Sequence, residues 1–110
     1  MSKVRLASVS ALAGALALAG AAALGADAAA KNRVVMDGTR YEPATLTVKR
    51  GATVSFVNKD PFPHTVTSAG SFDSKEIGAN RTWKYKAAKR GRFDYICTLH
   101  PNMKGTLVVE

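Results

Sequence analysis

The residues that could do chemistry gather near the end of the chain. The segment Phe93–Gly105 (FDYICTLHPNMKG) holds the chain's one cysteine, Cys97, followed at three-residue steps by His100 and Met103. The other histidine, His64, lies 33 residues before Cys97. Two histidines and a cysteine in a plane, with a weak axial methionine, form the blue-copper electron-transfer site. The four residues therefore predict one type 1 copper site that cycles between Cu(I) and Cu(II).

Other interpretations of these residues stay open at this point. Cys97 could be an inert core cysteine, Met103 a core residue and His100 a surface histidine, although both histidines would then be idle by coincidence. Cys97 and His100 also make half of a zinc site, but zinc prefers four strong ligands and a thioether is a poor fourth. Haem attachment requires C-x-x-C-H, which the sequence lacks. A thiol nucleophile with His100 as base has no visible orienting acid. We therefore predict no catalytic residue and no enzyme activity.

Short alternating segments must position these side chains, because no helical periodicity of useful length follows residue 31. Leu46 and Val48 alternate with polar neighbours, and Val54 and Phe56 do the same in the next segment. Glycine and proline turns separate the segments. The pattern predicts an all-β domain of about seven to eight strands, either an antiparallel sandwich or a small Greek-key barrel, and of these we expect the Greek-key β-sandwich. The expected strands are Arg33–Asp37, Ala44–Lys49, Ala52–Asn58, His64–Ser68, Arg81–Ala87, Arg92–Cys97 and Gly105–Val109.

The candidate ligands are expected where strands meet loops. Alternation puts Tyr95 and Cys97 on one inward face. Pro101 cannot donate to a ladder, so residues 98–104 are expected to stay a loop. His64 stands at another junction of loop and strand. Because the loops of a Greek-key sandwich cluster at its ends, His64 could meet the C-terminal loop.

Residues 1–30 have the features of a secretory signal peptide. Lys3 and Arg5 precede an uncharged run, Leu6–Ala26, and small residues then offer A-x-A cleavage sites. The run is mostly Ala, Gly and Ser, which favours a cleaved signal over a retained anchor. We predict a signal peptide at 1–30, one domain at 31–110, periplasmic localisation, and no membrane span after cleavage.

A single cysteine allows no internal disulfide, so a bound metal is the attractive extra source of stability in so small a domain.

The charge of the chain is strongly positive, with 16 Lys and Arg against 8 Asp and Glu. Without Lys3, Arg5 and Asp27 the counts are 14 and 7, a net charge of +7. Export argues against nucleic acid as the partner. An acidic redox protein fits better, as does an anionic membrane surface, while plain solubility is the alternative. We expect a monomer.

Nearly all of the expected domain at 31–110 resembles the cupredoxins, within them the plastocyanin-type group, and most closely the amicyanins. The short step from Cys97 to Met103 matches amicyanins, whereas plastocyanins and pseudoazurins place two more residues before the methionine. The resemblance implies a periplasmic one-electron carrier between redox proteins, such as a dehydrogenase or reductase and a cytochrome. It also implies ligand roles for His64, Cys97, His100 and Met103. The matching segments are Tyr41–Pro43, Val48–Asn58, Phe62–Val66, Phe93–Thr98 and His100–Pro101.

Two positions depart from that pattern. Many members have Asn after the first histidine, where this chain has Thr65, and a shorter hydroxyl is expected to replace only part of that brace between ligand loops. Amicyanins have Pro where this chain has Leu99, which should loosen the loop slightly.

The expected mechanism places His64 in the interior and makes His100 the electron port. An apolar patch around His100 would dock the partner, and nearby lysines would steer an acidic surface toward it. The rival function is a periplasmic copper chaperone or scavenger with the same ligands, and a third is a zinc-stabilised adhesion module. The patch residues are Pro61, Phe62, Leu99 and Pro101, and the lysines are Lys59 and Lys104.

Overall fold

The computed structural model describes residues 32–110, so the predicted signal peptide (residues 1–30) lies outside the described residues. All regular structure in residues 32–110 consists of β-strands. This part of the chain contains no helix of the length and apolarity needed to cross a membrane. The all-β prediction is therefore confirmed.

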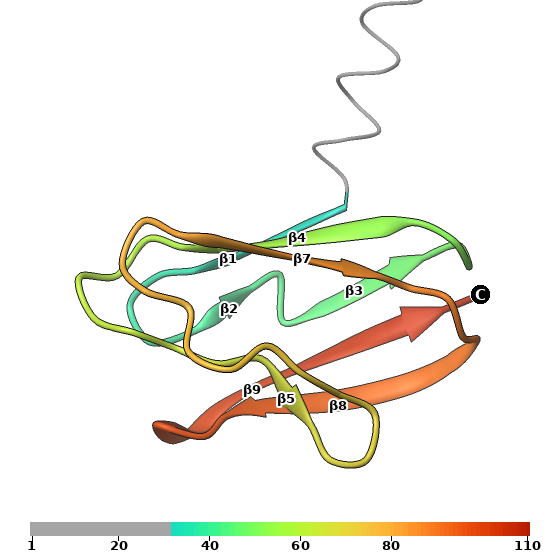
Figure 1. Ribbon diagram of the computed structural model, residues 1–110. Coiled ribbons are helices and arrows are strands. Elements are labelled where there is room, and N and C mark those ends of the chain that lie inside the picture. The colour runs from blue at the N-terminus through green and yellow to red at the C-terminus, as the bar shows by residue number, and fades with distance from the viewer. Residues whose placement is uncertain (1–31) are drawn as a thin grey trace, which may run out of the picture. The chain divides into compact units, whose positions relative to one another are not determined.

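Nine strands within residues 32–110 form two sheets that pack face to face (Figure 1). One sheet has the order β2-β1-β4-β7 and the other β3-β9-β8-β5-β6. The sandwich is as predicted, with nine strands in residues 32–110 where about seven to eight were expected. The strands β2 and β6 lie outside the expected ranges, because two-residue strands are too short to show alternation. The strands are β1 (Arg33–Met36), β2 (Tyr41–Glu42), β3 (Thr45–Val48), β4 (Thr53–Asn58), β5 (Thr67–Ser68), β6 (Phe72–Asp73), β7 (Thr82–Lys86), β8 (Gly91–Cys97) and β9 (His100–Val109).

Two strand pairs run parallel, so the expectation of purely antiparallel pairing is wrong. β1 pairs with β4, with Val34 opposite Phe56, and β3 pairs with β9, with Leu46 opposite Leu107. The long pairs β4–β7 and β8–β9 are antiparallel. Alternation of apolar residues indicates which face a side chain occupies, but it carries no information on the direction of the neighbouring strand.

The core between the sheets follows the predicted alternation. Val54 and Phe56 of β4 are fully buried, and so is Tyr95 of β8. Trp83 and Tyr85 of β7 are half-buried and pack against this cluster, with the Trp83 ring 5.6 Å from that of Phe56. Both aromatic residues of β7 are thus accounted for by packing.

The segments with the candidate ligands meet at one end of the sandwich. In Figure 1 the connection from β4 to β5 and the tip of the β8–β9 hairpin both lie at the left. The β3–β4 turn, the β7–β8 turn and the C-terminal end of β9 lie at the right. The two ends can therefore be considered separately as surfaces.

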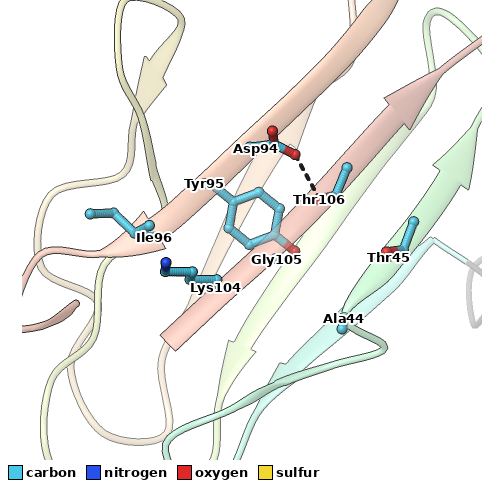
Figure 2. Close-up of a pocket in the computed structure, with 8 residues that line it drawn as sticks. All are labelled: Ala44, Thr45, Asp94, Tyr95, Ile96, Lys104, Gly105 and Thr106. Carbon is cyan, nitrogen blue, oxygen red and sulfur yellow. Dashed lines mark hydrogen bonds between the residues drawn. The ribbon is translucent and has the colours of Figure 1, made fainter. Parts of the chain in front are cut away.

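Gly105 lets the Tyr95 ring lie flat over β9, next to the end that holds the ligands. The two residues are opposite each other in the β8–β9 pair, and Figure 2 shows the ring across the glycine. A Cβ at Gly105 would lie 2.5 Å from Cζ of Tyr95. The ring is also held at its sides, by edge contacts with Tyr41 and Phe56 at centroid distances of 4.8 and 5.6 Å.

Gly105→Ala is therefore expected to lower the free energy of unfolding by about 1–3 kcal/mol through overpacking. Chemical denaturation of the metal-free protein measures the change. Gly78→Ala is the matched control, because its Cβ would meet Cγ of Arg81 at an ordinary 3.6 Å. An unchanged denaturation midpoint in Gly105→Ala would contradict the described packing.

Candidate metal centre

Cys97 is the last residue of β8, and its side chain is fully buried on the same inward face as Tyr95. The backbone N–H of Thr65 donates to Cys97 Sγ at 3.2 Å. Thr98 and Leu99 then turn the chain, so that His100 lies opposite Cys97 at the start of β9. This turn brings an imidazole to the sulfur within three residues.

The prediction that residues 98–104 form a loop is wrong in its boundaries, because β9 begins at His100. Cys97 is paired with His100, while the preceding residue, Ile96, is paired with Lys104. Residues 101–103 therefore form a bulge with no partner on β8. Pro101 lies in the bulge, where its missing N–H removes no ladder hydrogen bond. The expectation that Pro101 interrupts the strand pairing was therefore correct for residues 101–103. It was wrong for His100 and Lys104, which are paired with β8.

His64 lies in the connection between β4 and β5 and approaches the Cys97 sulfur from there. The predicted strand His64–Ser68 is reduced to β5, and His64 instead forms an isolated bridge with Ile77. The two residues exchange both backbone hydrogen bonds, with N···O distances of 3.1 and 2.7 Å. Two prolines just before His64 lack the N–H groups of a longer ladder, which explains the short pairing. The bridge fixes the backbone of His64, and its side chain is fully buried.

The two histidines present the same ring nitrogen to the sulfur. Nδ1 of His64 lies 3.7 Å from Cys97 Sγ, and Nδ1 of His100 lies 3.6 Å from it. An ion bonded to a thiolate at ~2.3 Å and to an imidazole at ~2.0 Å keeps these two ligand atoms ~3.5–3.8 Å apart in tetrahedral or trigonal geometry. The three ligand atoms all lie within 4.8 Å of one another. The residues present therefore fit one metal ion between them.

Asp60 holds the far side of the His64 ring, a role that the sequence reasoning missed. Its Oδ2 lies 2.7 Å from Nε2 of His64, and the same carboxylate accepts the N–H groups of Gly38 at 2.9 Å and Thr39 at 3.0 Å. Burial alone would raise the pKa of Asp60, but these hydrogen bonds outweigh it and hold the pKa below its usual range. With Nε2–H donating to the carboxylate, the Nδ1 lone pair faces Cys97. The signal available in the sequence was the four-residue step from aspartate to histidine.

Asn58 stiffens the loop between β4 and His64. Its Nδ2 donates to the carbonyl oxygens of Phe62 at 2.9 Å and Ile77 at 2.9 Å, with Gly78 at 3.2 Å. Its Oδ1 accepts the N–H of Asp60 at 2.9 Å. One buried amide thus ties the loop to the segment that bridges His64.

Thr65 links the segment that holds His64 to the segment that holds Cys97. From the sequence we expected its hydroxyl to replace only part of the brace that Asn provides in many cupredoxins. Its Oγ1 accepts the N–H of Thr98 at 2.9 Å and lies 3.0 Å from Oγ1 of Thr67. Its carbonyl accepts the hydroxyl of Tyr41 at 2.6 Å. Burial, with Cys97 and Tyr95 nearby, raises the pKa of Tyr41 far above its usual value, so the hydroxyl stays a donor. The threonine is therefore held from both of its neighbouring segments.

The sequence profile of the cupredoxin-like domain matches residues 8–109. The chain belongs to the cupredoxin-like family. It is 34% identical over 77 residues to amicyanin-alpha of Methylorubrum extorquens, an alignment that covers 64% of this chain and 65% of that protein. It is 32% identical over 88 residues to plastocyanin of Scenedesmus fuscus, covering 64% of this chain and 86% of the relative. The chain thus spans slightly less than two thirds of the amicyanin and most of the plastocyanin.

Solved structures give the same family. A reduced mutant of amicyanin superposes with a TM-score of 0.68 at 30% identity, covering 71% of this chain and 80% of that one. A copper-containing nitrite reductase from Thermus scotoductus matches with a TM-score of 0.67 at 29% identity, but only over 22% of its own length. The predicted family and its β-sandwich are confirmed.

In this cupredoxin three of the four predicted ligands, His64, Cys97 and His100, come together in space. Met103 lies in the bulge of β9 and is 3% exposed. It is buried and lies three residues after His100. Its role as the fourth ligand stays a prediction.

Asp60→Ala is expected to lower the free energy of unfolding of the metal-free cupredoxin by about 2–4 kcal/mol, because donors that lose a buried acceptor cost about 1–3 kcal/mol each. Denaturant titration measures the change. Asp60→Asn should fall between Asp60→Ala and the wild type, since one amide oxygen still accepts. Asp37→Ala, at an exposed aspartate next to Gly38, should change stability by less than about 0.5 kcal/mol. Equal stabilities for Asp60→Ala and the wild type would refute the anchoring role.

Proposed function

We propose that this cupredoxin is a one-electron carrier with one type 1 copper held by His64, Cys97, His100 and Met103. The observation that carries the proposal is the approach of two imidazole Nδ1 atoms to one buried sulfur, at 3.7 and 3.6 Å. A thiolate with two imidazoles and a weak thioether is the donor set of blue-copper electron transfer. The solved relatives include an amicyanin in its Cu(I) form, which supports the choice of metal.

Bound copper would supply one redox step between Cu(I) and Cu(II). The thiolate and thioether favour Cu(I), while the imidazoles serve both states. The hydrogen bonds of Asp60 and Thr65 hold the ligand segments in one arrangement, which keeps the reorganisation on electron transfer small. Four protein ligands leave no position for a substrate, so we propose a carrier and not an enzyme.

His100 is the ligand that reaches the surface. It is half-buried, whereas His64 and Cys97 are fully buried. Phe62 is 39% exposed and Leu99 45% exposed, and the Phe62 ring lies 5.5 Å from the His100 ring. We take these residues, with the exposed Pro61 and Pro101, as the docking patch for a redox partner. Lys59 and Lys104 are exposed and would steer an acidic partner toward it.

The burial of the ligands favours the carrier over the chaperone or scavenger. A copper chaperone must hand over its metal, which requires accessible ligands, whereas the Cys97 side chain has no exposed surface. Slow loss of copper to a chelator and a reversible voltammetric couple are the expected results. Rapid transfer of copper to the chelator would support the chaperone or scavenger function instead.

The cellular setting belongs to the same proposal. Residues 1–30 would direct export, and residues 31–110 would act in the periplasm as a monomer. The partners would be redox proteins with acidic docking surfaces, such as a cytochrome and a dehydrogenase or reductase. Mass determination of the protein recovered from an expressing bacterium tests the cleavage after residue 30 or near it.

Addition of copper(II) to the purified protein should produce an intense visible band from charge transfer between the Cys97 thiolate and copper. Cys97→Ser should lose the band entirely while keeping the fold. Met103→Leu should keep an intense band and change the reduction potential, because it removes only the weak axial donor. A colourless wild-type protein with copper would sink the proposal and leave the zinc-stabilised module as the better interpretation.

Leu99→Ser is expected to slow bimolecular electron transfer to a c-type cytochrome with an acidic surface by about fivefold or more, as truncation within an interface core does. Stopped-flow absorbance at the visible band measures the rate. Ile96→Ser is the matched control, because Ile96 is an apolar residue of similar exposure, 36%, on β8 outside the patch. Equal rates for the two variants would place the electron port elsewhere.

A further inference from the structure

The end of the sandwich opposite the metal centre is built from two turns and the end of β9. The N–H of Gly51 donates to the carbonyl of Ala87 at 2.7 Å, and the N–H of Ala87 donates to Ala52 at 2.8 Å. The N–H of Arg50 donates to the carbonyl of Glu110 at 2.8 Å. These contacts hold the β3–β4 turn, the β7–β8 turn and the C-terminal end of β9 together, at the right in Figure 1. We call this surface the basic end, and its exposed cations are Lys49, Arg50, Lys86, Lys89, Arg90 and Arg92.

The basic end holds most of the excess charge of the domain. Residues 32–110 contain 13 Lys and Arg and seven Asp and Glu, a net charge of +6. Six of the cations and two of the acids, Asp94 and Glu110, belong to the basic end, which accounts for +4 of that charge. Arg92 forms an ion pair with Asp94 at 3.4 Å. Among the described residues, the other five cations of this end have no ion-pair partner.

The basic end also lacks the apolar residues that a protein interface needs. Within residues 32–110 the large exposed apolar side chains are Phe62, Ile96 and Leu99, and none of them belongs to its turns. Specific protein interfaces have an apolar core with aromatic anchors. Long cationic side chains on two tight turns suit instead a diffuse anionic surface, which attracts each lysine or arginine independently.

We propose that the basic end binds the headgroups of an anionic phospholipid membrane. Binding there would leave the other end of the sandwich free, because β8 separates the two ends by about 20 Å at roughly 3.3 Å per residue. His100 and the docking patch would then face away from the membrane, toward soluble or membrane-bound redox partners. The inference concerns the surface charge alone and does not depend on copper binding.

The test is sedimentation with vesicles at low ionic strength. The protein is purified from an expressing bacterium, and its mass is measured to establish whether residues 1–30 are still attached. This control prevents vesicle binding by residues 1–30 from being attributed to the basic end. Vesicles of equal parts phosphatidylglycerol and phosphatidylcholine should bind it, and vesicles of phosphatidylcholine alone should not. Raising the salt concentration should release it, since surface charges are screened.

A matched pair of triple variants locates the binding surface. Arg50→Gln/Lys89→Gln/Arg90→Gln should lower the partition coefficient onto anionic vesicles about a hundredfold, at about fivefold for each cation near the surface. Arg40→Gln/Lys59→Gln/Lys104→Gln removes the same charge at the metal end and should bind nearly as the wild type. If the first variant fails to fold, Lys49→Gln/Lys86→Gln/Arg92→Gln replaces it, with denaturation curves recorded for all.

Several outcomes would overturn the proposal. Equal losses in the two variants would mean that net charge alone attracts the protein. Equal binding to neutral vesicles would assign the binding to apolar residues. Capture by an acidic protein without binding to vesicles would make that protein class the partner of the basic end. The visible band of the copper-loaded samples is recorded in parallel, so that failure of membrane binding is distinguished from failure of the proposed electron-carrier function.

Discussion

The contacts of the buried Cys97 sulfur constrain both segments that form the metal centre. Sγ accepts the N–H of Thr65 at 3.2 Å and faces Nδ1 of two histidines at 3.7 and 3.6 Å. A sulfur without exposed surface has no contact with water, so its polar partners must come from the protein. The β8–β9 hairpin delivers one imidazole and the β4–β5 connection delivers the other, together with the N–H group. The sandwich can therefore be understood as a frame that holds these two segments at a common point.

A second layer of polar contacts keeps that point from shifting. Asp60 joins the His64 ring to the backbone of the β1–β2 turn, and Asn58 joins the loop before His64 to the segment around Ile77. Thr65 is tied to Tyr41 on one side and Thr98 on the other. The side chains of Asp60 and Asn58 each bond several backbone groups, and that of Thr65 bonds the backbone N–H of Thr98. Such networks are stabilising when every member is paired, and loss of one member leaves others unsatisfied.

The two ends of the sandwich differ in chemistry because different side chains lie on their turns. The metal end exposes Phe62 and Leu99 around the half-buried His100, and the opposite end exposes a cluster of cations. An apolar patch favours a specific protein contact, while a cationic surface favours a diffuse anionic one. The long β8 strand keeps the two surfaces apart, so one can be occupied while the other stays open.

The sequence by itself determined the β-sandwich class and the faces of the long strands, and it pointed to the three side chains that the structure brings together, His64, Cys97 and His100. Cys97, His100 and Met103 follow one another so closely that few chemistries fit, and the alternation around Phe56 and Tyr95 reflects a local period of two residues. Only the tertiary structure decided the rest. The parallel pairs β1–β4 and β3–β9, the unpaired bulge after His100 and the contact of Asp60 with the β1–β2 turn were not predictable from local patterns. The Asp60 carboxylate is 22 residues from Gly38, whose N–H it accepts. Contacts over such separations depend on how the two sheets stack, and no local period in the sequence records that arrangement.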